Sequence, residues 1–294
     1  AKVLQTVLER KNIHFTPVVK CVAGDKRIVS TIESLGITHF AESRLDNIER
    51  LKDLKVTFTL LRAPSESEFD SMISNVEISI QTELGTIRKL NTIAKRLSMT
   101  HQIMLMIDWK DGREGVLTYD MIDYVNEIQK LSHIELVGIA FNFMCFKSLA
   151  PDENDIFMMN QFVTAIEQEM GYKFKVVSGG NSSMLPQTMY NNLGEINDLR
   201  IGEALIRGVD TTTYKPIASL YQDAIVLEAE IIEIKPRLNQ GTNQSYLQAI
   251  VDIGYLDTFT DGIQPVANEI KIIGASSDHL MIDLNNQDHY QVGD

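Results

Sequence analysis

Short apolar runs rich in β-branched residues alternate with longer amphipathic segments from residue 13 to about residue 205. This alternation is typical of strands and helices that succeed one another in a parallel sheet. It predicts eight strands, at residues 16–20, 37–42, 56–62, 77–82, 102–108, 134–141, 174–180 and 197–204. Helical segments are expected between them, several opening with Ser, Thr or Asp caps, and include residues 26–36, 45–54, 66–74, 86–98, 119–132 and 153–171. The fold class is therefore α/β, and the eight strands predict a TIM-type (β/α)8 barrel.

The pattern changes after about residue 219, where apolar and polar positions alternate without intervening helices. The period of two predicts strands in "DAIVLEAEIIEIKP", "SYLQAIVDIGYLD" and "NEIKIIGASSDHLMIDL". We therefore expect a barrel over residues 1–218 and a smaller all-β domain over residues 219–294. The chain begins inside a helical pattern and stops within a strand pattern, so we expect residues to be missing at both ends.

Composition narrows the classes of partner. The formal net charge of −13 and the pI near 4.9 argue against nucleic acid or an anionic membrane as the main partner, because both would be repelled. The two cysteines, Cys21 and Cys145, form no metal-binding spacing and no disulfide framework. No metal site is expected, and a reducing cytoplasm is the expected compartment. No apolar run reaches the ~20 residues of a membrane span.

Candidate catalytic and binding residues occur at the ends of the predicted strands. In a TIM barrel the functional groups lie at the carboxyl ends of the strands, so polar residues that end apolar runs are candidates. Lys20 ends the first run, and a lysine at the end of a buried strand needs a partner or a chemical task. Structural roles are expected for Glu42 and Arg62, which end the second and third runs. The other candidates are Asp108, Arg113, Asn142, residues 178–183 and residues 200–203.

Six strings occur in a consistent order along the chain: "PVVKCVAGD", "MIDWKDGREG", "SGGNSS", "LRIGEALIRG", "IGYLD" and "IIGASSDHLMID". Together they resemble strings of the fold-type III pyridoxal phosphate enzymes of the alanine racemase family, and are similar to its ornithine racemase-like branch. The resemblance implies that the protein uses pyridoxal 5'-phosphate to interconvert the L and D enantiomers of a small amino acid, ornithine or alanine-like. It also implies a homodimer with shared active sites.

The resemblance assigns roles to particular residues. Lys20 would bind the cofactor covalently and carry a proton during the reaction. Arg200 would donate to the pyridine nitrogen and keep it unprotonated, which favours racemisation over transamination; its structural alternative is pairing with acidic neighbours. Arg113 would bind the substrate carboxylate. The other cofactor contacts would come from Asn142, Ser178, Gly179, Gly180, Asn181, Ser182, Gly202 and Glu203, and the partner subunit would contribute Tyr255, Ser277 and Asp278.

The chain also departs from the family pattern. The tyrosine that normally follows the lysine is absent, with Ala23 and Gly24 there instead, and Asn142 stands where a histidine is expected. No tyrosine occupies the expected place of the second catalytic base, although Tyr246 could do so if its loop were shortened. The segment with Ser277 and Asp278 could equally be a hairpin turn.

Two other functions are compatible with parts of the sequence. The string "HFAESRLDN" also resembles single-domain barrels that carry pyridoxal phosphate without catalysis. Those carriers lack the all-β domain, so its presence favours the racemase. An amino-acid decarboxylase of the same fold type is the third alternative, but those enzymes resemble a larger chain and place an acid at the ring nitrogen.

Overall fold

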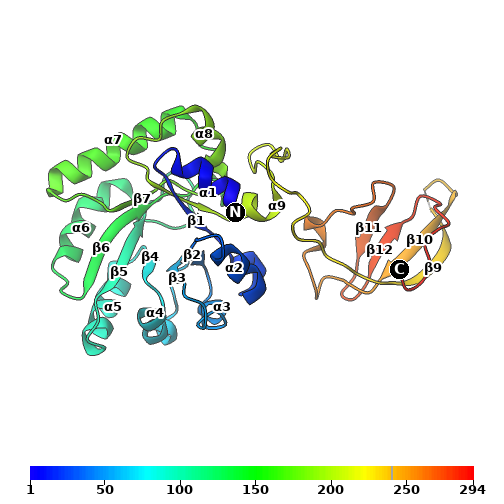
Figure 1. Cartoon of the computed structure of the whole chain (residues 1–294), viewed down its shortest axis with the longest axis horizontal. Helices are drawn as coiled ribbons and strands as arrows, with labels where there is room; N and C mark the ends of the chain where they lie inside the picture. Colours follow the sequence, from blue (N-terminus) through cyan, green and yellow to red (C-terminus); the bar gives the residue numbers. More distant parts are fainter. Residues whose placement is uncertain (240) are drawn as a thin grey trace. The chain divides into compact units, whose positions relative to one another are not determined.

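The computed structural model describes residues 1–239 and 241–294. The chain forms two compact units, Ala1–Ile225 and Val226–Asp294, whose elements are labelled in Figure 1. The sequence-based boundary between residues 218 and 219 stays a prediction of domain organisation. Each unit is described separately below.

The first unit is built on eight parallel strands, as the alternating sequence pattern predicted. The sheet order is β1-β8-β7-β6-β5-β4-β3-β2. A parallel bridge between Val18 and Ala41 joins the two ends of this order, and the Val19 amide donates to the Ala41 carbonyl at 2.9 Å. The strands thus form a TIM-type barrel. They are β1 (His14–Pro17), β2 (His39–Glu42), β3 (Thr57–Leu60), β4 (Ile78–Gln81), β5 (His101–Met106), β6 (Ile134–Ala140), β7 (Val176–Ser178) and β8 (Asp198–Ile201).

Helices lie around the outside of the barrel (Figure 1). Two of them begin at aspartates that accept backbone N–H bonds: Asp25 caps α2 and Asp152 caps α7. The long α-helices match the amphipathic segments of the sequence, and four short 3-10 turns lie between them. The α-helices are α1 (Lys2–Glu9), α2 (Lys26–Glu33), α3 (Leu45–Glu49), α4 (Phe69–Asn75), α5 (Leu84–Arg96), α6 (Met121–Gln129), α7 (Glu153–Met170), α8 (Leu185–Tyr190) and α9 (Glu203–Arg207); the 3-10 turns are η1 (Lys20–Val22), η2 (Glu66–Glu68), η3 (Thr118–Asp120) and η4 (Ser182–Met184).

Alternation along each strand separates two environments. Phe15, Leu199 and Ile201 belong to the large apolar core between the strands and the helices. Their neighbours Thr16 and Arg200 consequently face the barrel interior. The interior is divided chemically: β4, β5 and β6 contribute a small apolar cluster, whereas β1 and β8 contribute buried hydroxyl and charged groups. The polar half of the interior leads toward the carboxyl ends of the strands.

The second unit is a four-stranded antiparallel sheet in the order β11-β12-β10-β9. Its buried residues include Ala249, Val251, Ile282 and Leu284, which form a core separate from that of the barrel. The α/β fold class with an added all-β domain is therefore confirmed. The elements are β9 (Ile231–Leu238), β10 (Ser245–Val251), β11 (Lys271–Ala275), β12 (Leu280–Asp283) and the 3-10 turn η5 (Thr260–Gly262).

Two searches of the described residues gave no candidates. Among residues 1–239 and 241–294, no helix combines the length and apolar character that a membrane crossing requires. In the same residues, no group of three or more His, Cys, Asp or Glu side chains is arranged to hold a metal ion.

Candidate active site

A cavity of about 260 Å³ opens at the carboxyl ends of the barrel strands. It brings together residues that are far apart in the sequence but were predicted for one site. Its lining comprises Val18, Lys20, Leu61, Met106, Arg113, Asn142, Met144, Cys145, Asn181, Ser182, Ser183, Arg200, Gly202, Glu203, Thr211 and Tyr214. The cavity carries three cationic side chains and one carboxylate, in a chain whose formal net charge is −13. This local positive charge favours an anionic ligand.

Lys20 lies at the cavity, but the structure corrects the expectation that it ends a buried strand. Strand β1 ends at Pro17, and Lys20 begins the 3-10 turn η1 with its side chain exposed. Backbone pairing continues just past Pro17, since the Val18 amide donates to the Ile201 carbonyl and the Val19 amide to the Ala41 carbonyl, both at 2.9 Å, and the chain then turns into η1. The amine is therefore presented from a turn above the barrel mouth, where it can reach a ligand in the cavity.

Arg200 is the buried charge of the site, with only 3% of its surface exposed. Its Nη2 donates to the Phe141 carbonyl at 2.7 Å and to Asn142 Oδ1 at 3.1 Å, and its Nη1 donates to the Ser178 hydroxyl. Burial lowers the pKa of Arg200, although the nearby Asp198 carboxylate opposes this effect. A guanidinium remains protonated and can only donate. Among the described residues Nε has no hydrogen-bond partner, so a donor is left for a ligand.

Asp198 supports Arg200 through the Ser178 hydroxyl, which contacts both side chains. Its Oδ1 accepts from Thr16 Oγ1 at 2.6 Å, and its Oδ2 accepts from the Ser178 hydroxyl. Burial alone would raise the pKa of Asp198, but hydrogen bonds from His14, Ser178 and Thr16 hold that pKa below its usual value. The carboxylate is therefore charged and supports the Arg200 cation through a shared hydroxyl.

Ser178, Gly179 and Gly180 were predicted to contact the cofactor, and the structure does not place them in the cavity lining. The Ser178 hydroxyl is buried and used by Asp198 and Arg200. A Cβ at Gly179 would lie 2.4 Å from Ile196 Cγ2, so close packing explains this glycine. The loop contributes to the cavity only from Asn181 onward.

The residues from Asn181 onward carry hydroxyl and amide donors. Asn181 Oδ1 accepts from the Ser183 amide at 2.9 Å and from the Ser183 hydroxyl at 2.7 Å. Ser182 Oγ accepts from the Ala204 amide at 3.1 Å, which ties this loop to the one after β8. Gly202 lies at the same place, where a Cβ would approach Val18 Cβ to 3.0 Å. Close backbone approach and hydroxyl donors are what a phosphate group requires.

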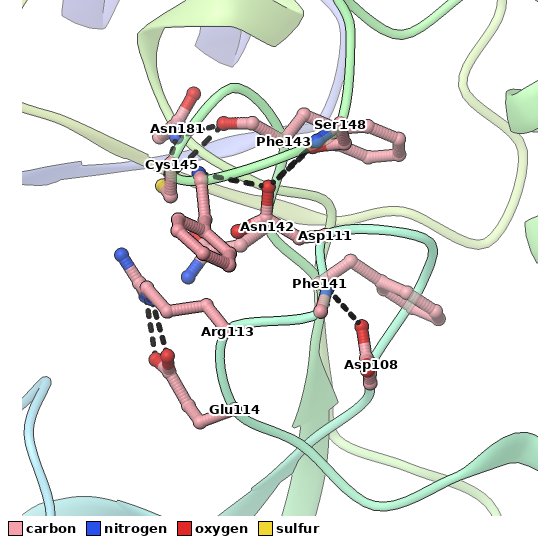
Figure 2. A network of polar contacts seen from close by, with 12 residues as sticks. Asp108, Asp111, Arg113, Glu114, Phe141, Asn142, Phe143, Cys145, Ser148 and Asn181 are labelled. Atoms are coloured by element: carbon pink, nitrogen blue, oxygen red, sulfur yellow. Dashed lines mark hydrogen bonds and ion pairs between the residues drawn. The ribbon is translucent and has the colours of Figure 1, made fainter.

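The loop after β5 is anchored to the loop after β6, as Figure 2 shows. Asp111 is buried, and its Oδ1 accepts from the Phe146 amide at 3.1 Å, the Ser148 amide at 3.1 Å and the Ser148 hydroxyl at 2.6 Å. Next to this anchor, Arg113 pairs with Glu114. The predicted carboxylate-binding role of Arg113 stays a prediction; its side chain is 40% exposed and lines the cavity.

Asn142 and Glu203 also line the cavity, whereas Asp108 lies outside the lining and accepts from the Gly112 amide at 2.8 Å. Asn142 accepts from Arg200, so this amide occupies a position beside the buried cation. The Glu203 carboxylate pairs with Arg207 Nη1 at 2.7 Å. Glu42 and Arg62 were expected to have structural roles. Glu42 accepts from the amides of the two residues after it, and Arg62 lies 3.9 Å from Glu68.

Sequence reasoning missed several residues of the lining. They come from loops or from apolar positions that carried no motif: Val18, Leu61, Met106, Met144, Cys145, Thr211 and Tyr214. Thr211 is buried, and its hydroxyl has no hydrogen-bond partner among the described residues. Cys145 follows the polar end of β6 by a few positions. The rule of inspecting strand ends could have reached it if extended through the loop.

The predicted residues of the second unit lie on two joined segments. The Tyr255 amide donates to the Ser276 carbonyl at 2.9 Å, and the Leu256 amide donates to the Ser277 carbonyl at 3.0 Å. Tyr255 is 59% exposed, and Asp278 is exposed in the turn between β11 and β12. The hairpin-turn interpretation of this segment is therefore confirmed, and Tyr255 and Asp278 both stay candidates for contacts in trans.

The donor set of the cavity fits pyridoxal phosphate. Lys20 supplies an amine for an aldehyde, Arg200 supplies an N–H donor for a ring nitrogen, and Ser182 and Ser183 supply hydroxyls for a phosphate. The cationic lining complements the negative charge of that phosphate. These groups converge from the ends of β1, β7 and β8, which are adjacent strands of the barrel.

Comparisons with known proteins agree with this geometry. The chain is 32% identical over 313 residues to ornithine racemase of Acetoanaerobium sticklandii, an alignment covering 100% of this chain and 89% of that protein. It is 28% identical over 313 residues to lysine racemase of Thermotoga maritima, an alignment covering 100% of this chain and 88% of that protein. The fold resembles the solved alanine racemase of Clostridium difficile 630, with a TM-score of 0.71 and 20% identity. The match covers 100% of this chain and 82% of that one. The family model described as alanine racemase, N-terminal domain, matches residues 1–208, and the chain belongs to this family.

Proposed function

We propose that this protein racemises a basic amino acid of the ornithine or lysine type. The protein is a pyridoxal phosphate-dependent racemase, a function supported by its family and by its two racemase relatives. The basic substrate is inferred from the names of those relatives. The observation that carries the proposal is that Lys20, Arg200 and the loop residues Ser182 and Ser183 line one positively charged cavity.

Bound pyridoxal phosphate would withdraw the electron pair of the α-carbon–hydrogen bond. We assign the remaining tasks to side chains of the chain. Lys20 would hold the cofactor through its amine and would exchange a proton with the substrate α-carbon from one face. Arg200 would donate a hydrogen bond to the ring nitrogen without protonating it, which would favour reprotonation of the α-carbon over transamination. Arg113 binds the substrate carboxylate, and residues 181–183 and Gly202 bind the phosphate.

We further propose that the active form is a homodimer in the cytoplasm. The second unit carries Tyr255 and Asp278 on adjoining exposed segments, as expected of groups that act in the site of a partner subunit. An exposed carboxylate at Asp278 suits the second ammonium group of a basic amino acid. Both cysteines are free, which agrees with a reducing compartment.

The test is made on the protein loaded with pyridoxal phosphate. It is incubated in heavy water with single enantiomers of ornithine, lysine and alanine, and chiral chromatography with mass spectrometry follows configuration and α-deuteration. Racemisation with deuterium incorporation, fastest for ornithine or lysine, supports the proposal. Release of the corresponding amine would indicate a decarboxylase, and cofactor binding with no change in any amino acid would indicate a carrier.

Borohydride reduction followed by peptide mapping tests the cofactor site separately. The pyridoxyl group should appear on Lys20 alone. Lys20→Arg keeps the positive charge at the turn but cannot be reduced onto the cofactor in this way, so it serves as the matched control. Labelling of another lysine in the wild-type protein would contradict the assignment of the site.

A further inference from the structure

Racemisation requires a second proton carrier on the face of the α-carbon opposite Lys20, and we infer that Cys145 is this carrier. The inference rests on the proposed function. It fills a role for which the sequence offered no tyrosine at the expected place. Cys145 lines the same cavity as Lys20 and is a free, exposed thiol.

The titratable groups of the cavity leave few candidates for this role. Arg113 and Arg200 cannot give up a proton at ordinary pH. Glu203 is held in an ion pair with Arg207. Among the groups that one chain supplies to its own cavity, Cys145 and Tyr214 remain, and they arise from different sides of the barrel mouth.

Cys145 and Tyr214 differ in their position on the barrel relative to Lys20. Strand β1, which leads to Lys20, pairs directly with β8, and Tyr214 lies in the loop that follows α9 after β8. Its ring is also covered by the Arg207 guanidinium, 5.6 Å from the ring centroid. Cys145 follows β6, which is separated from β1 by β7 and β8 on one side and by β2 to β5 on the other. The thiol therefore faces the cavity from across the mouth, as two carriers on opposite faces of one carbon require.

The Cys145 thiol has polar neighbours on two sides. Its Sγ donates toward the Phe143 carbonyl at 3.5 Å, and Asn181 Nδ2 donates toward Sγ at 3.3 Å (Figure 2). Pairing with Glu114 raises the pKa of Arg113, so this cation stays protonated beside Cys145 in the cavity. Arg200, which is nearly fully buried and keeps a free N–H donor, marks the cavity between the two carriers as a ligand site.

The proton balance is closed by the two carriers. In one direction the Lys20 amine takes the α-proton from one face, and the Cys145 thiol gives its proton to the same carbon from the other face. In the reverse direction the Cys145 thiolate takes the proton and the Lys20 ammonium supplies one. No oxidant, reductant or third reactant is needed.

The test compares Cys145→Ala and Cys145→Ser with Cys21→Ala, which removes the other free cysteine, in holoenzyme incubated with each ornithine enantiomer in heavy water. General acid–base groups contribute on the order of 10²–10⁴ in rate, so racemisation should fall at least ~100-fold in Cys145→Ala. That variant should still exchange the α-hydrogen of the enantiomer whose hydrogen faces Lys20, with retention of configuration. Exchange in the other enantiomer should be lost. Cys21→Ala should keep both.

A second readout does not depend on turnover. Iodoacetamide should alkylate Cys145 in the wild-type protein, and pyridoxal phosphate with ornithine should slow this labelling while leaving Cys21 labelling unchanged. Racemisation by Cys145→Ala within about threefold of wild type, or equal loss of exchange in both enantiomers, would overturn the role of Cys145. If both Cys145 variants fail to bind cofactor, the labelling experiment on the wild-type protein decides. Alkylation of Cys145 that pyridoxal phosphate and ornithine do not slow would then overturn its role. A wild-type protein that exchanges neither enantiomer would overturn the proposed function, and this inference with it.

Discussion

Replacing Asp198 with alanine should destabilise the barrel and disorder the support of Arg200. Asp198 is 5% exposed and accepts hydrogen bonds from Thr16 at 2.6 Å, from His14 Nδ1 at 3.4 Å and from Ser178. The alanine variant would leave these donors without their acceptor. It would also leave the buried Arg200 cation without its neighbouring negative charge. Breaking one side of a buried ionic network costs about 3–5 kcal/mol.

That cost is large compared with a typical unfolding free energy of about 5–15 kcal/mol. The chain has a single tryptophan, Trp109, which lies in the barrel core and reports barrel unfolding by fluorescence. Urea titrations should therefore show the loss in Asp198→Ala, and a smaller loss in Asp198→Asn, which keeps the shape and one acceptor oxygen. Asp70→Ala is the control, because Asp70 is 59% exposed in its surface pair with Arg96. A loss in Asp198→Ala below about 1 kcal/mol would refute a network in which Asp198 carries a buried charge.

The other predictions concern pH, the ring nitrogen and the shared site. Burial lowers the pKa of His101 to about 4 from its usual 6.5, so the unfolded chain binds a proton first and stability falls as pH drops from 6.5 to 4. The expected loss is about 3 kcal/mol at about 1.36 kcal/mol per pH unit, and His101→Gln should remove it in urea titrations at pH 7 and pH 4.5. Arg200→Glu should let the ring nitrogen become protonated, which slows racemisation and increases transamination measured as keto-acid formation; an unchanged ratio would place another residue against the ring. Mixed chains of Lys20→Ala and Asp278→Ala should recover activity as heterodimers if the site is shared, and no recovery despite proven subunit exchange would argue against sharing.

The barrel and most of its cavity could be predicted from the sequence, because strand periodicity is local and parallel strands bring their carboxyl ends together. That reasoning places Lys20, Arg200 and Gly202 at one mouth of the barrel, and all three line the cavity. It failed where a contact depends on which side of a strand end a residue faces. Ser178 is the clearest case: its buried hydroxyl supports Arg200, and the loop reaches the cavity only three positions later, at Asn181.

Loop residues were missed for a different reason. Cys145 is positioned by contacts with Asn181 and Phe143, and its loop is anchored by Asp111 from the turn after β5. These contacts join segments that are far apart in the sequence. Loop conformation of this kind is set by tertiary contacts rather than by local pattern, so composition and periodicity carry no signal for it.

The missing tyrosine after Lys20 has a structural reason that the sequence could not reveal. The backbone turns sharply there, with Ala23 at φ +49° and Gly24 at φ +71°. A Cβ at Gly24 would lie 2.8 Å from the carbonyl oxygen of Asn47, which is itself buried in α3. Helix α3 therefore fills the space that a side chain at this position would need. We expect phosphate binding without that tyrosine to rely on the loops after β7 and β8, where Ser182, Ser183 and Gly202 line the cavity.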